Sequence, residues 1–157
     1  MIKLSIPGQE TALNLTTLLL DVNGTITVDG ELIEGTTELI DLLKKDLQIY
    51  LLTADTHGRI EKLAEWLDLP FFKVSGDHGN EDKLDFMNTI DPKKTVAIGN
   101  GYNDSLMLEH AALSIAIIGK EGASSRALQR ADVVVLNIID ALELLLHPLR
   151  LVATLRR

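Results

Sequence analysis

The sequence contains no cysteine among its 157 residues. A chain without thiols forms no disulfide framework and offers no thiolate ligand to zinc, so both of these protein classes are excluded. The chain also lacks an uninterrupted apolar run of the roughly 18 residues that a transmembrane helix needs, and its first residues do not form the apolar core of a secretory signal. We therefore expect a cytoplasmic protein with no membrane-spanning segment.

Basic side chains are fewer than acidic ones: 15 Lys and Arg stand against 23 Asp and Glu, a net charge of −8. Because contacts to nucleic acid backbones need clustered Lys and Arg, nucleic acid is not an expected partner. Hydrophobic residues make up 46% of the chain, an ordinary share for a globular protein. The length suits one domain with a proper core, so we expect a single domain over residues 1–157.

Short apolar runs alternate with stretches of helical periodicity along the chain. Most of these runs are almost continuously apolar, which is typical of strands that are buried on both faces. Strands that alternate with helices favour a parallel sheet, and the handedness of crossovers leaves a doubly wound, Rossmann-like α/β fold as the simplest arrangement. The expected strands are 16–20, 48–53, 71–74, 95–99, 113–118 and 132–136, and the expected helices lie near 35–46, 58–68, 81–90, 104–112, 122–130 and 138–146.

Two hairpins and a terminal helix complete the expected architecture. The Asp29-Gly30 pair between two short β-prone stretches is typical of a type I′ turn, which predicts a small flap hairpin over residues 26–33. The sequence signal for a second hairpin, over residues 2–16, is weaker. The leucine-rich C-terminal stretch predicts a helix and tail that pack across the sheet, and a contact in a homo-oligomer is the alternative.

Polar residues end several of the expected strands. Asp21 follows the first strand, Thr53 ends the second, and the segment from Asn100 to Asp104 follows the fourth. The carboxyl ends of parallel strands share one edge of the sheet, so these side chains should meet in one crevice. A carboxylate there can be a nucleophile toward phosphorus or a ligand of magnesium.

Each of these residues alone has an ordinary structural explanation. Thr53 could be a plain strand residue, Asp104 could cap the following helix, and Lys83 could be a solvated residue near a helix start. Their convergence on one edge favours a phosphoryl-transfer site, where Lys83 would balance the carboxylates.

The motifs resemble those of the haloacid dehalogenase superfamily of aspartate-dependent phosphatases and phosphotransferases. The segment from Asp21 to Thr25, DVNGT, is similar to its first motif, DxDGT, and Thr53 and Lys83 are similar to its second and third motifs. The segment from Gly99 to Asp104, GNGYND, is similar to the fourth motif, GDGxND. The likeness covers about residues 16–137 and is strongest to the phosphorylation domain of P-type ATPases, in a capless, stand-alone form.

This resemblance implies a mechanism. Asp21 would attack phosphorus and form an aspartyl-phosphate, Lys83 would steady the charge, and Mg²⁺ would be the cofactor. The implied residues are Asp21, Asn23, Thr53 and Lys83 for catalysis, Gly24, Thr25, Ala54 and Asn103 for substrate binding, and Asp21, Asn23, Asn100 and Asp104 for the metal.

Two asparagines depart from the superfamily pattern. Asn23 stands where its phosphatases carry the aspartate that acts as general acid and base, and an amide cannot transfer that proton. We therefore expect a phosphoenzyme that forms from a good leaving group and hydrolyses slowly. Asn100 replaces a metal-ligand aspartate, which should weaken magnesium binding because ligand charge helps to set affinity.

The spacing of the motifs limits the substrate and leaves alternatives. The stretches between Asp21, Thr53 and Lys83 leave no room for a cap domain, so the crevice should be open to a small or macromolecular phosphorylated substrate, or be covered by a neighbouring subunit. A catalytically impaired module that binds phosphorylated ligands or protein partners is the main alternative, and the two asparagines support it. A receiver-type phospho-switch is less favoured, because its phosphorylated aspartate normally ends the third strand.

Overall fold

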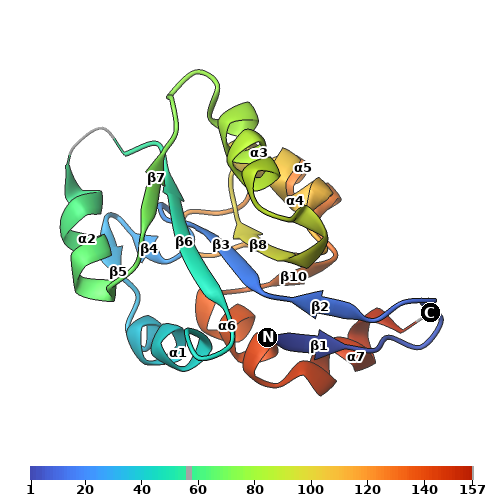
Figure 1. Cartoon of the computed structure of the whole chain (residues 1–157). Helices are drawn as coiled ribbons and strands as arrows, with labels where there is room; N and C mark the ends of the chain where they lie inside the picture. The colour runs from blue at the N-terminus through green and yellow to red at the C-terminus, as the bar shows by residue number, and fades with distance from the viewer. Residues whose placement is uncertain (56–57, 157) are drawn as a thin grey trace.

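A six-stranded parallel sheet forms the centre of the protein (Figure 1), in a computed structural model that describes residues 1–55 and 58–156. The strand order β10-β9-β8-β3-β6-β7 places β3 between β8 and β6. The chain moves outward from β3 to one edge and then crosses to the other, which is the doubly wound order predicted from the sequence. The strands are β3 (Thr17–Asp21), β6 (Gln48–Thr53), β7 (Phe71–Lys73), β8 (Thr95–Gly99), β9 (Leu113–Ile117) and β10 (Val133–Val135).

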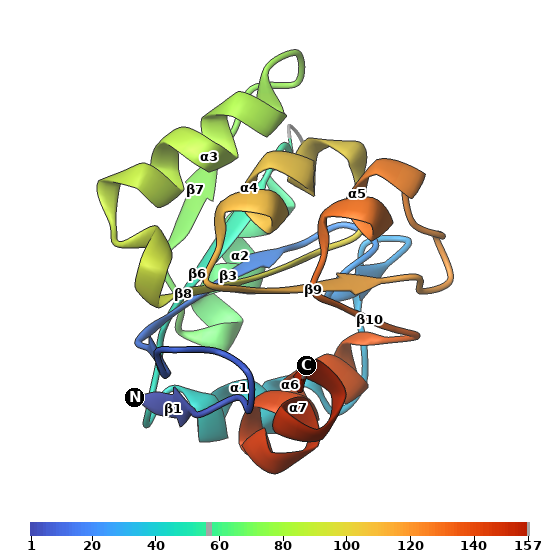
Figure 2. The same ribbon diagram turned by 90° about the vertical axis from the view of Figure 1, so that its right-hand side faces the viewer.

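Helices cover both faces of this sheet, as Figure 2 shows from the side. Successive side chains of a strand point to opposite faces, and β3 divides accordingly: Leu18 and Leu20 join one buried apolar cluster and Leu19 joins the other. The first face carries α1 (Thr36–Leu43), α2 (Arg59–Leu67), α6 (Ile138–Leu146) and α7 (Pro148–Leu155). The second carries α3 (Gly79–Thr89), α4 (Ser105–His110) and α5 (Ser125–Arg130), with the 3-10 turns η1 (Pro92–Lys94) and η2 (Tyr102–Asp104) leading into β8 and α4.

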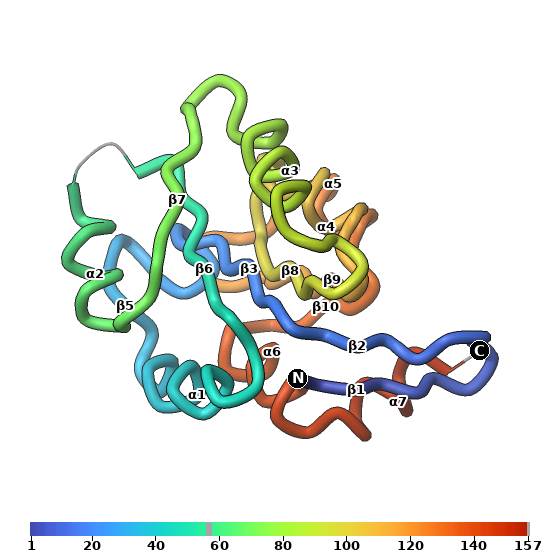
Figure 3. Tube along the Cα trace, in the orientation of Figure 1, coloured from blue at the N-terminus to red at the C-terminus, as the bar shows by residue number. Residues whose placement is uncertain are grey.

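Two antiparallel hairpins lie outside the sheet. β1 (Ile2–Leu4) pairs with β2 (Leu13–Leu15), and α7 packs against β1 near the chain terminus, as the trace in Figure 3 shows. β4 (Thr27–Val28) pairs with β5 (Glu31–Leu32), and the Asp29-Gly30 turn between them has positive φ at both residues, 52° and 82°. Positive φ at both positions defines a type I′ turn. We call residues 26–33 the flap.

Most element boundaries differ from the sequence expectation by a residue or more, and three of these differences change the description of the fold. β3 is shifted by one residue, so Asp21 is the last residue of the strand and is not the first residue after it. The helix expected over 122–130 begins only at Ser125, because Gly122 has a φ of 77° and the Ser124 side chain caps the helix by accepting from Arg126 N. Residues 148–155 form a full helix, where the sequence suggested a tail.

In the described residues 1–55 and 58–156, no helix combines the length and the apolar character that crossing a bilayer requires.

Candidate active site

Asp21 ends the central strand and is almost fully buried, at 6% exposure. The chain then turns tightly, since the backbone N–H groups of Thr25, Ile26 and Thr27 all donate to the carbonyl of Val22. Gly24 lies inside this turn at a φ of 76°, and a Cβ there would come within 2.5 Å of the Asn100 amide nitrogen. Glycine is therefore needed both for the backbone conformation and for the close approach of the next loop.

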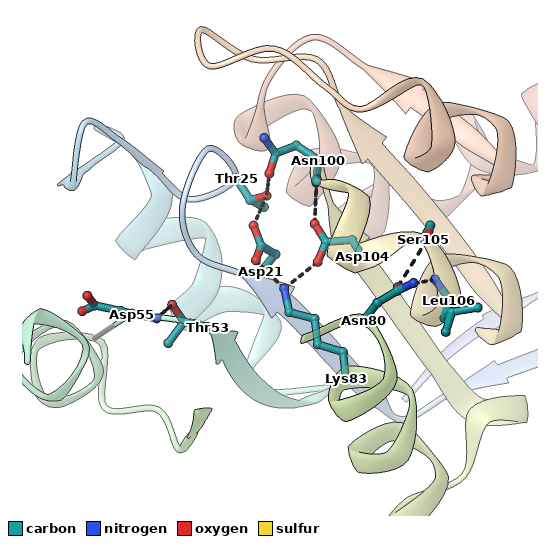
Figure 4. Close-up of polar contacts among 11 residues, drawn as sticks. Asp21, Thr25, Thr53, Asp55, Asn80, Lys83, Asn100, Asp104, Ser105 and Leu106 are labelled. Carbon is teal, nitrogen blue, oxygen red and sulfur yellow. Dashed lines mark hydrogen bonds and ion pairs between the residues drawn. The ribbon is translucent and has the colours of Figure 1, made fainter. Parts of the chain in front are cut away.

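Lys83 reaches the strand ends from the first half of α3 and is fully buried. Its Nζ lies 2.6 Å from Asp21 Oδ1 and 2.6 Å from Asp104 Oδ1, so one ammonium bridges two carboxylates (Figure 4). A buried charge is tolerated when it is paired and hydrogen-bonded. The sequence reading of Lys83 as a solvated helix residue is therefore wrong.

Asp104 is also fully buried, and both of its oxygens accept hydrogen bonds from the protein. Oδ1 accepts from Lys83, and Oδ2 accepts from the backbone N–H groups of Asn100 at 3.0 Å and Gly101 at 2.8 Å. Gly99 makes room for this carboxylate, because a Cβ at that position would lie 2.5 Å from its Oδ2. Asp104 thus fixes both the lysine and the loop after β8.

The Thr25 hydroxyl joins Asp21 to Asn100. It lies 2.9 Å from Asp21 Oδ2 and 3.1 Å from Asn100 Oδ1, so two acceptor oxygens converge on one hydroxyl (Figure 4). The Asn100 amide nitrogen donates in turn to the Gly122 carbonyl at 3.0 Å. The orientation of this amide therefore presents its oxygen to Asp21 and its nitrogen to the loop before α5.

Burial and the neighbouring charges shift the pKa values of both Asp21 and Lys83. Burial raises the pKa of the Asp21 carboxyl to about 6, and the nearby Asp104 charge adds to this rise, while Lys83 and the Thr25 hydroxyl partly oppose it. Burial alone would lower the pKa of the Lys83 ammonium, but the charges of Asp104 and then Asp21 outweigh it and raise that pKa above its ordinary value. Lys83 is therefore charged at neutral pH, and Asp21 becomes ionised just below it.

The other residues that the sequence predicts for the site form no side-chain hydrogen bond to Asp21 within the part of the chain that the structure describes. Thr53 is buried at the end of β6, where its hydroxyl accepts from the backbone N–H of Asp55 at 3.1 Å. Ala54 follows it and is half-buried. Asn103 lies in η2 beside the start of α3, and the Asn23 side chain is exposed.

Two residues that the sequence did not indicate lie at the tip of the flap, and one of them, Glu121, is hydrogen-bonded to it. Glu121, in the loop between β9 and α5, accepts from the backbone N–H of Asp29 at 2.8 Å through Oε1. Its Oε2 lies 3.0 Å from the position of a Cβ on Gly24, so the carboxylate spans from the flap to the turn after Asp21. From the other side, the Nη1 atom of Arg59 lies 2.5 Å from the position of a Cβ on Gly30. One sequence signal could have identified Glu121: it lies between two glycines, in Gly119-Lys120-Glu121-Gly122, shortly after the end of a strand.

The flap separates two hollows. A cavity of about 200 Å³ is lined by Asn23, Gly30, Arg59 and their neighbours. A larger groove of about 690 Å³ lies on the other side, between the flap and the ends of β9 and β10, and its lining is mostly apolar. Gly24 and Thr25 line this groove as well, so both hollows adjoin the turn that follows Asp21.

Comparison with known proteins connects this geometry to one family of enzymes. The family model for haloacid dehalogenase-like hydrolases matches residues 82–140, a segment that includes Lys83, Asn100 and Asp104. An uncharacterized protein of Methanocaldococcus jannaschii is 55% identical over 64 residues, which are 41% of this chain and 69% of that protein. A soluble P-type ATPase-like phosphatase of the same organism is 26% identical over 140 residues, or 87% of this chain. The chain spans about half, 51%, of the length of that phosphatase.

Solved structures show the same fold. The cobalt-bound deoxy-D-mannose-octulosonate 8-phosphate phosphatase of Haemophilus influenzae superposes with a TM-score of 0.71 at 16% identity, over 85% of this chain and 88% of that one. The 3-deoxy-D-manno-octulosonate 8-phosphate phosphatase of Moraxella catarrhalis, in complex with magnesium, phosphate and KDO, gives a TM-score of 0.71 at 12% identity, over 85% and 86% of the two chains. At these identities the likeness establishes the fold.

The raised pKa of Asp21 predicts how its replacement changes stability with pH in the absence of metal. A carboxyl with a raised pKa stabilises the fold while it is protonated, and this contribution is lost as the pH rises through the folded-state value of about 6. Asp21→Asn, which stays neutral, should therefore gain stability over wild type between pH 4 and 6 and reach a plateau above pH 7, with a gain of about 3 kcal/mol for a shift from 3.8 to about 6.

Urea denaturation in EDTA at a series of pH values measures this difference. Asp85→Asn makes the same chemical change at an exposed position of α3 and should show no such rise. A stability difference between Asp21→Asn and wild type that stays constant from pH 4 to 8 would contradict the burial argument.

The hydrogen bond from Asp29 N–H to Glu121 predicts that this glutamate holds the flap. Its removal in Glu121→Ala should cost about 1 kcal/mol, which corresponds to about fivefold faster hydrogen exchange in a segment that opens locally. Hydrogen–deuterium exchange of peptides covering residues 27–32 measures this change. Glu121→Gln keeps an acceptor and should show a smaller effect, and Glu65→Ala on α2 should show none. Unchanged exchange in Glu121→Ala would rule out this role.

Proposed function

Because this chain belongs to the haloacid dehalogenase superfamily, as a phosphatase-like hydrolase, we propose that it is a magnesium-dependent phosphohydrolase or phosphotransferase that acts through an aspartyl-phosphate at Asp21. The observation that carries this proposal is the carboxylate at the end of the central strand, held from two sides by Lys83 and Thr25. Phosphoryl transfer asks mainly for positioning and charge neutralisation, and this arrangement supplies both.

In the first step an oxygen of Asp21 attacks phosphorus, the bond to the leaving-group oxygen breaks, and that oxygen takes its proton from water. In the second step water attacks the phosphorus of the aspartyl-phosphate, loses a proton to solvent and releases inorganic phosphate, which restores Asp21. Lys83 holds one carboxylate oxygen and Thr25 the other, so the nucleophile cannot rotate between the steps. A pKa of about 6 leaves Asp21 mostly ionised at neutral pH, as attack requires.

The donor atoms around Asp21 suit magnesium, which prefers oxygen ligands. The Asp21 carboxylate and the Asn100 amide oxygen converge on one hydroxyl, and the backbone carbonyl of Asn23 follows in the same turn. In the described residues no group of three His, Cys, Asp or Glu side chains could hold a metal, so these mixed donors are the proposed ligands. When bound, magnesium would neutralise charge on the phosphoryl oxygens. The magnesium and phosphate in the Moraxella catarrhalis structure support this assignment.

Asp104 receives a different role from the metal-ligand role that the sequence suggests. Three protein donors occupy this carboxylate, two of them on Oδ2, whereas each oxygen of Asp21 accepts a single hydrogen bond and keeps a lone pair for phosphorus or a metal. We therefore propose that it acts through Lys83 and the loop after β8, and that Asn100 is the ligand from that loop. Thr53, Ala54 and Asn103 remain proposed contacts of the phosphoryl group or substrate.

Asn23 sets the expected rate. Its side chain is exposed at the turn after Asp21, where a proton carrier would serve the leaving group, and an amide cannot transfer that proton. We expect turnover to be slow and to favour phosphorylated small molecules with good leaving groups, such as acyl phosphates.

Phosphate release from acetyl phosphate and a panel of phosphate esters, with magnesium, tests the proposal. Asp21→Asn should abolish release, and Asn23→Asp should raise the rate on poor leaving groups by at least about a hundredfold, the lower end of general acid–base contributions. Asn14→Asp changes the net charge equally in β2 and should leave the rate unchanged. Intact-mass analysis should detect one added phosphoryl group in wild type and none in Asp21→Asn.

Equal phosphate release by wild type and Asp21→Asn on every substrate would overturn the proposal. Binding of phosphorylated ligands without release would instead favour the non-catalytic module, the alternative that Asn23 and Asn100 support.

A further inference from the structure

The cavity beside Asn23 contains an unused positive charge. Arg59, the first residue of α2, lines this cavity together with Asn23, Gly30 and one acidic residue, Asp55. Its backbone N–H donates to Asp55 Oδ2, which caps the helix, while its guanidinium reaches the tip of the flap. Within residues 1–55 and 58–156, no carboxylate forms an ion pair with this guanidinium, whereas Arg130 and Arg150 each pair with a glutamate.

The position of the cavity relates it to the leaving group. Asn23 and Val22, the two residues after Asp21, both line it. In phosphoryl transfer the leaving group departs on the side of phosphorus opposite the attacking oxygen. A phosphate ester with its phosphorus at Asp21 therefore needs space next to this turn for the rest of the molecule. The cavity provides that space, and the guanidinium lies at its wall.

The size and charge of the cavity indicate what fits. Its volume of about 200 Å³ is below the ~300–1,000 Å³ of sites that bury drug-sized ligands, so the leaving group must be small. A guanidinium binds carboxylates and phosphates in a bidentate manner. In a chain with a net charge of −8, an arginine without an ion-pair partner among the described residues is a local attraction for an anion at the wall of this cavity.

We infer that the substrate is a small phosphorylated compound whose leaving group carries a second anionic group, a carboxylate or phosphate, and that Arg59 binds this group in the cavity beside Asn23. This inference rests on the proposed phosphohydrolase function and names its substrate class. The groove on the other side of the flap is a poorer place for an anion. Two acidic residues, Glu31 and Glu34, line it with one cation, Lys120, whereas the cavity has one acidic residue, Asp55, beside Arg59.

A matched pair of esters tests the inference. 3-Phosphoglycerate and glycerol 3-phosphate differ in that a carboxylate of the first is a hydroxymethyl group in the second. Wild type should prefer 3-phosphoglycerate by at least about tenfold in kcat/KM, the effect of one charge-assisted hydrogen-bonded pair. Arg59→Gln should bring this ratio close to one, and Arg59→Lys, which keeps the charge without the planar fork, should give an intermediate ratio.

Lys120→Gln is the matched control, because it removes the cation of the groove on the opposite side of the flap and should keep the wild-type ratio. A wild-type ratio near one, an unchanged ratio in Arg59→Gln, or a ratio lost in Lys120→Gln in place of Arg59→Gln would overturn the inference.

Binding measured by calorimetry separates this inference from the proposed function. The Asp21→Asn protein should bind 3-phosphoglycerate more tightly than glycerol 3-phosphate, and the double variant Asp21→Asn, Arg59→Gln should lose that difference. The same binding preference in a protein that releases no phosphate from these esters, from acetyl phosphate or from the rest of the panel would support the anion-binding role of Arg59 and overturn the proposed function. Turnover of both esters with equal kcat/KM would support the proposed function and overturn the inference.

Discussion

The ammonium of Lys83 has no exposure to solvent, and it is stable there because carboxylates from two different segments lie 2.6 Å away on either side. Asp21 comes from the central strand β3, Asp104 from the turn after β8, and Lys83 from α3 on one face of the sheet. The bridge therefore fixes three segments at the edge where ligands bind in open α/β folds. Removing Lys83 would leave two buried carboxylates without their cation, and removing Asp104 and Asp21 together would leave the buried ammonium without a partner, so the charged forms depend on one another. Buried ion pairs are often no more stabilising than well-packed apolar side chains of similar volume. Function explains this group of charges better than stability does, because a chain selected only for stability could fill the same space with leucine.

The flap depends on this edge as well. Its tip is a type I′ turn without strong interactions of its own, and a two-stranded hairpin is marginal in water. The turn is held from one side by Glu121 and approached from the other by Arg59. These contacts keep the flap between the cavity and the groove next to Asp21, so the two hollows stay separate. The same residues that position the flap thus shape the space that a leaving group would occupy, which links substrate size to the stability of one small hairpin.

The sequence contains most of the fold and part of the site. The alternation of apolar runs located all six strands of the sheet, because strands buried on both faces leave a continuous signal. It also placed Asp21 and Asn100 together, since strand ends of a parallel sheet share an edge. The fold prediction is confirmed, and the bridge from Lys83 to both aspartates is closer than motif order alone could indicate. Glu121 and Arg59 were missed for a physical reason. Both act on the flap from loops or helix starts far away in the chain, and no local periodicity records a contact between residues 29 and 121. The hydrogen bonds of Asp104 could not be predicted either, because the sequence shows a carboxylate but not the N–H groups that donate to it.

The net charge of this buried group explains why an asparagine at position 100 suits the site. Asp21, Asp104 and Lys83 together carry one net negative charge in a buried site. An aspartate in place of Asn100 would add a second, and it would also replace the amide N–H that donates to the Gly122 carbonyl by an oxygen facing an oxygen. The amide avoids both costs and still presents an oxygen toward Asp21. With a divalent cation bound, the site would carry a net positive charge where an aspartate would leave it neutral, so the asparagine weakens the hold on the metal but strengthens the attraction for an anionic phosphoryl group. In the proposed mechanism Asn23 leaves this turn without a proton carrier, which would slow hydrolysis of an aspartyl-phosphate without disturbing its formation from a good leaving group. On the proposed mechanism, the two amides together would give a site that accepts a phosphoryl group readily and releases it slowly.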